Sequence, residues 1–279
     1  PRRLLRLLRH LKRKTLQLGR MTVSSGNREV ADRWDCKRWN DFKDNLNRIY
    51  VSNLFQKAHF SSLESINKWN GFTDFIEQCP FTTKEDLAKD RQNNPPYGTN
   101  LTFPVSEYKK FNQTSGTQGK PMTWLDTPED WRWMLGNWDR VLESAGIQQG
   151  DRCFFAFSFG PFLGFWTAYE SATQRGCICI PAGGQSTEQR LHGIIHQKAQ
   201  HLFCTPTYAM RLTSVATESG VNLEKNDLKS IIVAGETGGS LPAFRKRMSS
   251  AWGKEVNVHD HYGMTEVGPV AYETPGQSG

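Results

Sequence analysis

Residues 152–181 read "RCFFAFSFGPFLGFWTAYESATQRGCICIP", and this stretch decides the fold class. The run at 152–158 is apolar over the length of a strand, and residues 177–181 form a second short run of the same kind. Residues 163–175 between them have the length of a helix. Two apolar strands joined by a helix predict a parallel β–α–β unit, with strands buried on both faces.

The same alternation continues toward the carboxyl end of the chain. Further short β-type runs occur at 201–205, 230–235 and 255–260. Helical segments fit between the runs at 187–199, 207–219 and 242–252. Another helix precedes the unit, because Thr127 and the proline and acids after it form a helix start and Gly146 ends it. We therefore predict an α/β fold, a mostly parallel sheet flanked by helices.

The amino-terminal part reads as a separate, polar region. Residues 28–75 are rich in Trp, Asn and Lys and predict short surface helices. Thr82 and Thr83, followed by two acids, predict another helix start. Prolines, asparagines and Gly98 make residues 91–106 a loop or linker. The predicted division is a basic tail at 1–20, a helical region at 21–106 and an α/β core at 107–279 that is incomplete at its carboxyl end.

The basic charge of the chain belongs to its tail. The formal net charge of +7 includes eight Lys or Arg in residues 1–20, which leaves −1 for residues 21–279. The body therefore gives no reason to expect nucleic-acid binding. Leucines at helical spacing make the tail either an amphipathic targeting or membrane-surface segment, or a stretch upstream of a true start at Met21.

Cysteine usage and hydropathy predict an intracellular, cytoplasmic protein. The six cysteines are spread along the chain without C-x-x-C spacing, so neither a zinc ribbon nor a redox motif is expected. We interpret Cys177 and Cys179 as core thiols. No run of about 18 apolar residues occurs, so no membrane span is expected. Nothing in the sequence predicts an oligomeric state.

The segment at 112–121, "NQTSGTQGKP", is rich in small hydrogen-bond donors. Its glycines let backbone N–H groups turn inward together and form a nest for an anion, while the hydroxyls add donors and Lys120 adds a charge. It is not a Walker A motif, because its glycines are too close together and Pro121 follows the lysine. Taken alone it predicts either a flexible turn or a phosphate-binding loop.

Polar clusters also follow three of the predicted strands. They lie at 158–162, 234–239 and 259–266. Ligands of open parallel sheets bind beyond the carboxyl ends of strands. We therefore expect these clusters to converge with the 112–121 loop on one cleft.

Two motifs, in this order along the chain, resemble those of a known enzyme superfamily. The stretch "TSGTQGKP" at 114–121, followed by "YGMTE" at 262–266, resembles the adenylate-forming superfamily of acyl-CoA synthetases, peptide-synthetase adenylation domains and luciferases. The stretches "PFTTKEDL", "FSFGPF", "IPAGGQSTEQR" and "VAGETGGS" look like its phenylacetate–CoA ligase branch. The resemblance covers roughly residues 40–275. It implies the large N-terminal domain of such an enzyme, truncated before the small lid domain.

The resemblance implies a nucleotide site at matching positions. The residues implied to hold the β- and γ-phosphates of ATP are Thr114, Ser115, Gly116, Thr117, Gln118, Gly119 and Lys120, with Gln118 where the family usually has Thr. The segment implied to lie along adenine is Ala234, Gly235 and Glu236. Tyr262 is implied to pack against the base, Thr265 to donate to the α-phosphate and Glu266 to bind Mg²⁺. The same turn includes Asp260, His261 and Gly263. Thr265, Glu266 and Lys120 are the implied catalytic residues.

The resemblance also implies a pocket for a carboxylic acid. The matching residues are Phe157, Phe159, Gly160 and Phe162, with Phe where the family often has Tyr. Phe157 is as readily read as a core aromatic. An apolar pocket suits an aryl or hydrophobic, phenylacetate-like acid. Trp166 and Tyr169 add bulk nearby and leave the identity of the acid open.

The implied reaction joins the acid to ATP, giving acyl-AMP, and then to coenzyme A, giving the thioester. It needs no protein nucleophile, in keeping with the absence of a Ser-His-Asp pattern in the sequence. The family's lid lysine and ribose-binding aspartate have no counterpart in residues 267–279, so we expect little or no ligase activity from this chain alone. The alternatives are an adenylyltransferase with another acceptor and a non-catalytic nucleotide-binding protein.

Overall fold

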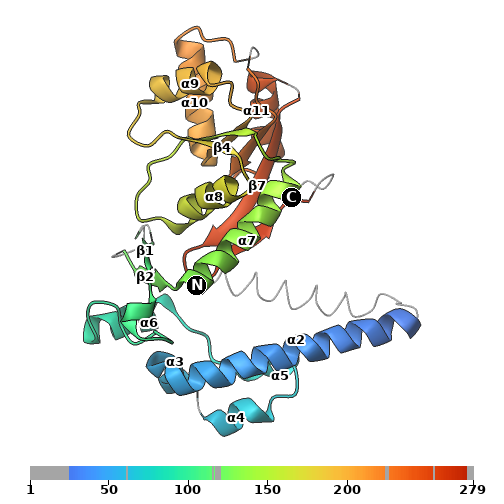
Figure 1. Ribbon diagram of the computed structural model, residues 1–279, viewed down its shortest axis with the longest axis vertical. Coiled ribbons are helices and arrows are strands. Elements are labelled where there is room, and N and C mark those ends of the chain that lie inside the picture. Colours follow the sequence, from blue (N-terminus) through green and yellow to red (C-terminus); the bar gives the residue numbers. More distant parts are fainter. Residues whose placement is uncertain are drawn as a thin grey trace. The chain divides into compact units, whose positions relative to one another are not determined.

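The computed structural model describes residues 25–60, 62–114, 116, 121–223, 226–253 and 255–274, with the backbone alone for 25–35. The predicted tail at 1–20 lies outside these residues. The described chain falls into two compact units, one ending at Phe103 and the other beginning at Pro104 (Figure 1). No helix among the described residues is long and apolar enough to cross a membrane.

The amino-terminal unit is helical. Its helices are α2 (Ser25–Ser52), α3 (Leu54–His59), α4 (Leu63–Lys68), α5 (Phe72–Gln78) and α6 (Lys84–Asn93). The prediction of short helices over this region is wrong for α2, which has 28 residues. Trp39, Phe42 and Leu46 lie one turn apart on one face of α2, and this buried stripe keeps the segment helical. The rings of Trp39 and Phe72 pack edge to face at 5.3 Å.

The start predicted for α6 is confirmed. The Thr83 side chain accepts a hydrogen bond from the Asp86 backbone N–H, and the Asp86 carboxylate accepts one from the Thr83 backbone N–H. The predicted loop at 91–106 is shorter than expected, because α6 continues to Asn93 and a 3₁₀ turn occupies Val105–Glu107.

The second unit contains a six-stranded sheet. Its strands are β3 (Arg152–Phe155), β4 (Ile178–Pro181), β5 (His201–Cys204), β6 (Ser230–Val233), β7 (Asn257–Met264) and β8 (Gly268–Tyr272). Their order across the sheet is β4-β3-β5-β6-β7-β8. All neighbours pair in parallel except β7 and β8, which are antiparallel. The predicted α/β fold with a mostly parallel sheet is confirmed.

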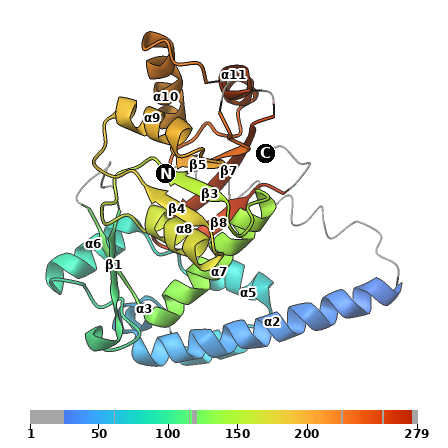
Figure 2. The same cartoon turned by 45° about the horizontal axis from the view of Figure 1, so that its top comes forward.

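Helices cover both faces of this sheet (Figure 2). They are α7 (Pro128–Ser144), α8 (Leu163–Gln174), α9 (Thr187–His196), α10 (Pro206–Glu218) and α11 (Pro242–Trp252). Side chains alternate along each strand, so Phe154 packs in the cluster under α9, α10 and α11. Cys153 and Phe155 pack in the cluster under α7 and α8. Burial of both faces explains why these strands read as continuous apolar runs.

The structure adds three strands that the sequence did not predict. A separate two-stranded hairpin consists of β1 (Lys110–Gln113) and β2 (Thr123–Asp126), which lie on either side of the 114–122 loop. Both strands are short and mix polar with apolar residues, so no pattern marks them. The third is β8, and pairing with it extends β7 to Met264, beyond the predicted end at residue 260.

Candidate functional site

The order of the strands creates one reversal in the sheet. From β3 the chain crosses through α8 to β4 on one side, then through α9 to β5 on the other side of β3. The carboxyl ends of β3 and β5 are therefore neighbours, while the helices that leave them cover opposite faces. Ligands of open α/β sheets bind outside the strand ends at such a reversal. Residues 156–162 and 205–207 occupy that place.

The predicted adenine segment follows β6 and is tied to this reversal. The Glu236 carboxylate accepts hydrogen bonds from the Thr207 hydroxyl (2.6 Å) and the Thr207 backbone N–H (3.2 Å), at the start of α10. Gly235 has φ of 86°, a conformation that favours glycine. A Cβ at Gly239 would lie 2.7 Å from Cγ of Asp260. The segment after β6 and the middle of β7 are thus in direct contact.

The second motif lies differently from the prediction. It was expected beyond the end of a strand, but Asp260, Tyr262 and Gly263 belong to β7 itself, and Thr265 and Glu266 lie in the turn to β8. The pairing of β7 with β8 is irregular between Tyr262 and Gly263. The Tyr262 side chain is 59% exposed, so its ring is open to a ligand. Burial raises the pKa of Asp260 above its usual range.

His261 points away from the exposed face of β7. Its ring packs against the ring of Trp138 of α7, with centroids 4.3 Å apart and planes inclined by 35°. The side chain is buried, and neither ring nitrogen has a hydrogen-bond partner among the described residues. Burial lowers the pKa of His261 to about 4. Its role in nucleotide binding stays a prediction.

The predicted phosphate loop is the connection of the β1–β2 hairpin. Thr114 begins it, because its backbone N–H donates to the Met122 carbonyl (2.9 Å) and its hydroxyl accepts from the Met122 N–H (3.0 Å). Gly116 has φ of 68°. Ser115 and residues 117–120 lie outside the described residues, so their predicted roles stay predictions.

The hairpin lies beside the predicted acid segment. The backbone N–H of Gln113 donates to the carbonyl of Pro161 at 2.6 Å. Asn112 donates to Asp126 across the hairpin at 2.8 Å, and burial raises the pKa of Asp126 to about 6. The structure therefore places the end of β1, at Gln113, beside Pro161 of the predicted acid segment. The convergence of the two segments on one cleft stays a prediction.

Three residues that the sequence did not single out fasten the hairpin. Lys110 of β1 forms an ion pair with Glu170 of α8 at 2.7 Å. The other oxygen of Glu170 accepts from the Trp131 indole N–H at 2.6 Å. The Lys110 ammonium also lies 4.3 Å from the centre of the Trp131 ring. An isolated two-stranded hairpin is marginal in water, so this contact stabilises its position.

A buried arginine supports the strand ends on the other face. Arg190 of α9 donates to the carbonyls of Ala182 and Ala156, which follow β4 and β3, at 2.8 and 3.4 Å. Its guanidinium lies 5.1 Å from the centre of the Tyr208 ring. No carboxylate within the described chain forms an ion pair with it. Sequence reasoning missed Arg190 because both acceptors are backbone carbonyls.

The predicted acid segment is rich in ring contacts. Phe157 is 6% exposed and stacks on Phe165 of α8, with centroids 3.7 Å apart. Phe159 is half-buried and meets Trp166 at 4.8 Å. Phe162 is exposed and its ring lies against Gly160. Phe157 is therefore a core aromatic at the edge of the site.

The sequence model of the AMP-binding enzyme family matches residues 111–278, from strand β1 to beyond β8. The chain belongs to the AMP-binding enzyme family. This agrees with the superfamily resemblance drawn from the two motifs.

Named relatives of this AMP-binding chain include acid–CoA ligases. It is 29% identical to phenylacetate-coenzyme A ligase of Thermus thermophilus over 193 residues, which are 69% of this chain and 41% of that protein. It is also 23% identical to a nonribosomal peptide synthetase of Metarhizium robertsii over 221 residues, which are 78% of this chain and 2% of that protein.

Solved structures show the same fold. A structure of 2-hydroxyisobutyryl-CoA ligase with 2-HIB-AMP and CoA superposes with a TM-score of 0.77 and 25% identity, over 87% of this chain and 52% of that one. The AMP-binding chain thus spans about half the length, or less, of these ligases.

A Ser–His–Asp arrangement occurs elsewhere in the AMP-binding chain. The Ser230 hydroxyl lies 2.7 Å from Nδ1 of His201, and Nε2 of His201 lies 3.0 Å from the Asp151 carboxylate. Ser230 and His201 are buried, and they begin β6 and β5 at the amino edge of the sheet. A nucleophile there has no access to the carboxyl edge. The three residues therefore join strand ends and form no second active site.

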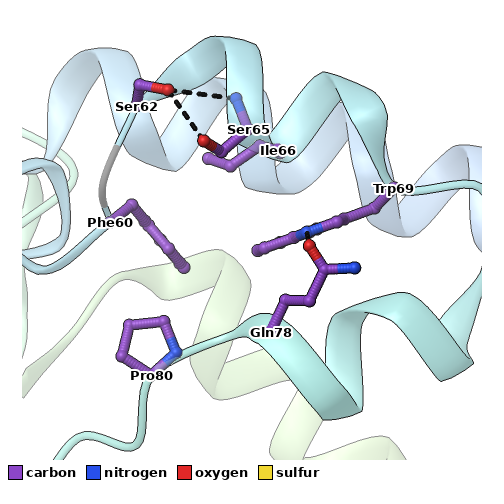
Figure 3. Close-up of a pocket in the computed structure, with 7 residues that line it drawn as sticks. All are labelled: Phe60, Ser62, Ser65, Ile66, Trp69, Gln78 and Pro80. Atoms are coloured by element: carbon purple, nitrogen blue, oxygen red, sulfur yellow. Dashed lines mark hydrogen bonds between the residues drawn. The ribbon is translucent and has the colours of Figure 1, made fainter.

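A small cavity of about 130 Å³ lies in the helical unit (Figure 3). It is lined by Phe60, Ser62, Ser65, Ile66, Trp69, Gln78 and Pro80. Its polar groups already bond to one another, since Trp69 donates to Gln78 at 3.0 Å and the Ser62 hydroxyl accepts from the Ser65 N–H. The cavity shares no residue with the predicted nucleotide or acid sites.

Proposed function

We propose that this chain forms the nucleotide- and acid-binding part of an AMP-forming acid–CoA ligase. The observation that carries the proposal is the 2.6 Å hydrogen bond from Gln113 to Pro161. It joins the end of β1, which leads into the loop proposed to hold phosphates, to Pro161 of the segment proposed to hold the acid. An enzyme that joins an acid to ATP needs these two sites within reach of one another.

In the proposed reaction a carboxylate oxygen of the acid attacks the α-phosphorus of ATP. The bond between the α-phosphorus and the bridging oxygen breaks, and pyrophosphate leaves. The thiol of coenzyme A, losing its proton to solvent, then attacks the acyl carbon and displaces AMP. Two anions approach in the first step, so the proposed donors Thr117, Lys120 and Thr265 offset their repulsion.

Glu266 is the proposed ligand of Mg²⁺. It is half-buried in the turn after β7, and its carboxylate makes no ion pair or hydrogen bond within the described part of the chain. No cluster of three or more His, Cys, Asp or Glu among the described residues is placed to hold a metal alone. One carboxylate would fit a Mg²⁺ that arrives with ATP, since phosphate and water oxygens would supply its other ligands. When bound, the ion supplies positive charge beside the phosphates.

Coenzyme A is the proposed acceptor because both named ligase relatives use it. Those relatives differ in their acid, one named for phenylacetate and the other for 2-hydroxyisobutyrate. The stretches that resemble the phenylacetate–CoA ligase branch support a hydrophobic acid. The free cysteines of the chain support a cytoplasmic location.

Binding of a stable acyl-adenylate mimic tests the proposal. Adenosine 5′-sulfamate and its N-acyl derivatives copy AMP and acyl-AMP, and calorimetric titration of the 279-residue chain measures their affinity. We expect binding that AMP displaces and that Thr265→Ala weakens about tenfold, the size of one lost charge-assisted hydrogen bond. The exposed Thr217→Ala on α10 is the matched control and should bind as the parent chain does. No binding, or binding indifferent to AMP and to Thr265, would contradict the proposal.

A further inference from the structure

The packing around the predicted acid segment bears on the size of the acid. We infer that the acid is a compact aliphatic acid, because Phe165 and Trp166 of α8 fill the space beside Phe157 and Phe159 that an aryl group needs. The inference rests on the proposed function, since it assigns the acid to the segment after β3. It narrows the aryl or hydrophobic acids expected from the sequence to small aliphatic ones.

Helix α8 begins directly after the acid segment and faces back onto it. Its first residue is Leu163, and the N-cap residue Phe162 makes no side-chain capping bond. Phe165 and Tyr169 are four residues apart and so lie on one face of the helix, with Trp166 beside them. This face carries three aromatic side chains toward residues 157–159.

Ring distances show how fully the space is used. The centroids of Phe157 and Phe165 are 3.7 Å apart with planes inclined by 22°, which is face-to-face contact. Phe159 meets Trp166 at 4.8 Å and Tyr169 at 5.4 Å, within the range of touching rings. A phenyl group inserted between two such rings needs a separation of about 7 Å, twice the contact distance. An aryl acid therefore has to displace a side chain, whereas a short aliphatic acid has only to reach the edge of the cluster.

The rings have little room to retreat. Phe157 is backed by Phe155 at 5.8 Å, and Phe155 stacks on Phe203 at 4.5 Å. On the other side of the segment, a Cβ at Gly183 would lie 3.3 Å from the Phe159 ring, so the turn after β4 also touches it. The cluster is closed from behind and from one side.

The Trp166 indole is held in place by a hydrogen bond. Its N–H donates to the Gly160 carbonyl at 2.9 Å, which fixes the ring over the acid segment. Moving the ring aside for a larger acid breaks this bond. Trp166 is also 37% exposed, so its removal opens space toward solvent with little loss of core packing.

The test compares acids of two sizes on one nucleotide scaffold. Three probes are titrated into the chain: bare adenosine 5′-sulfamate, its N-isobutyryl derivative and its N-phenylacetyl derivative. We expect the isobutyryl probe to bind at least about tenfold more tightly than the phenylacetyl probe. In Trp166→Ala this preference should disappear or reverse, and Phe165→Leu, a milder change, should reduce it. Trp133→Ala, which removes an exposed tryptophan of α7, is the matched control and should keep the parent preference.

The outcomes separate the inference from the proposed function. If the phenylacetyl probe binds the parent chain as tightly as the isobutyryl probe, or if Trp166→Ala leaves the ratio unchanged, the inference is overturned while the proposed function stands. If none of the three probes binds, the proposed function falls, and the inference falls with it.

Discussion

His261 makes the stability of the second unit depend on pH in a way that can be calculated. Its ring is buried against Trp138 without a hydrogen-bond partner, and its pKa of about 4 lies below the ordinary value of 6.5. The folded state therefore favours the neutral ring. The stability it contributes is fully present above pH 6.5 and is lost as the pH falls through 4.

The magnitude follows from the shift of about 2.5 pKa units. At about 1.36 kcal/mol per unit, the full loss is about 3 kcal/mol, of which about 2 kcal/mol has occurred by pH 5. The substitution His261→Phe keeps a flat ring against Trp138 and removes the titrating group. Relative to the parent chain, the variant should gain about 2 kcal/mol of unfolding free energy between pH 7.5 and pH 5.

Urea unfolding, followed by tryptophan fluorescence at several pH values, measures this difference, and other titrating groups cancel because both proteins share them. Asp126→Asn provides a control of opposite sign. The pKa of Asp126 is raised to about 6, so its stability contribution is present below 3.8 and lost as the pH rises through 6. That variant should lose roughly 1 kcal/mol relative to the parent chain over the same fall in pH. If His261→Phe and the parent chain lose stability in parallel from pH 7.5 to pH 5, the burial and isolation of His261 are wrong.

Two further predictions concern the packing of the site. Gly239→Ala should lower the unfolding free energy by about 1–3 kcal/mol and weaken nucleotide binding, because the new Cβ meets Val233 and lies 2.7 Å from the Asp260 carboxyl carbon. Gly136→Ala, whose Cβ has no neighbour within 4 Å, is its control. Equal urea midpoints for the two variants would refute the clash. A double-mutant cycle on Lys110→Met and Glu170→Gln should give a coupling free energy of unfolding of about 0.5–1 kcal/mol, which decreases in high salt. Zero coupling would show that the ion pair does not stabilise the hairpin.

The parallel strands and several helix ends followed from local rules. Strands buried on both faces, such as β5 and β6, are apolar at every position after the first, and this pattern can be recognised without knowing which strands pair with them. The start of α7 is similarly local, since the Thr127 hydroxyl accepts from the Asp130 N–H three residues later. Its end is marked by Gly146, with φ of 73°.

The elements that were missed depend on distant partners. The hairpin strands β1 and β2 are stabilised by each other and by Glu170, 60 residues from Lys110. The extension of β7 depends on β8. Asp151 and His201 are 50 residues apart, and no motif marks their pairing. A single sequence carries no signal for such contacts.

The candidate site, too, could be predicted from the sequence only in part. The segments after β3 and β6 lie at strand ends, as the alternation of strands and helices predicted. Most of the second motif instead lies within β7, because β8 extends that strand. The aromatic contacts of Phe157 and Phe159 with α8 could not, because they depend on which face of the helix turns toward the segment. The size of the acid is therefore a question that the sequence left open and the packing addresses.

One titration tests the central claim most directly, namely that Thr117 of the hairpin loop and Glu266 of the turn after β7 bind the same ATP. Mg²⁺–ATP is titrated into the 279-residue chain and into the double variant Thr117→Ala/Glu266→Ala, with heat of binding as the signal. The account predicts binding by the parent chain and a loss of at least about tenfold in the double variant, since one donor and one carboxylate are removed. Equal binding by both proteins, or none by a folded parent chain, would contradict it.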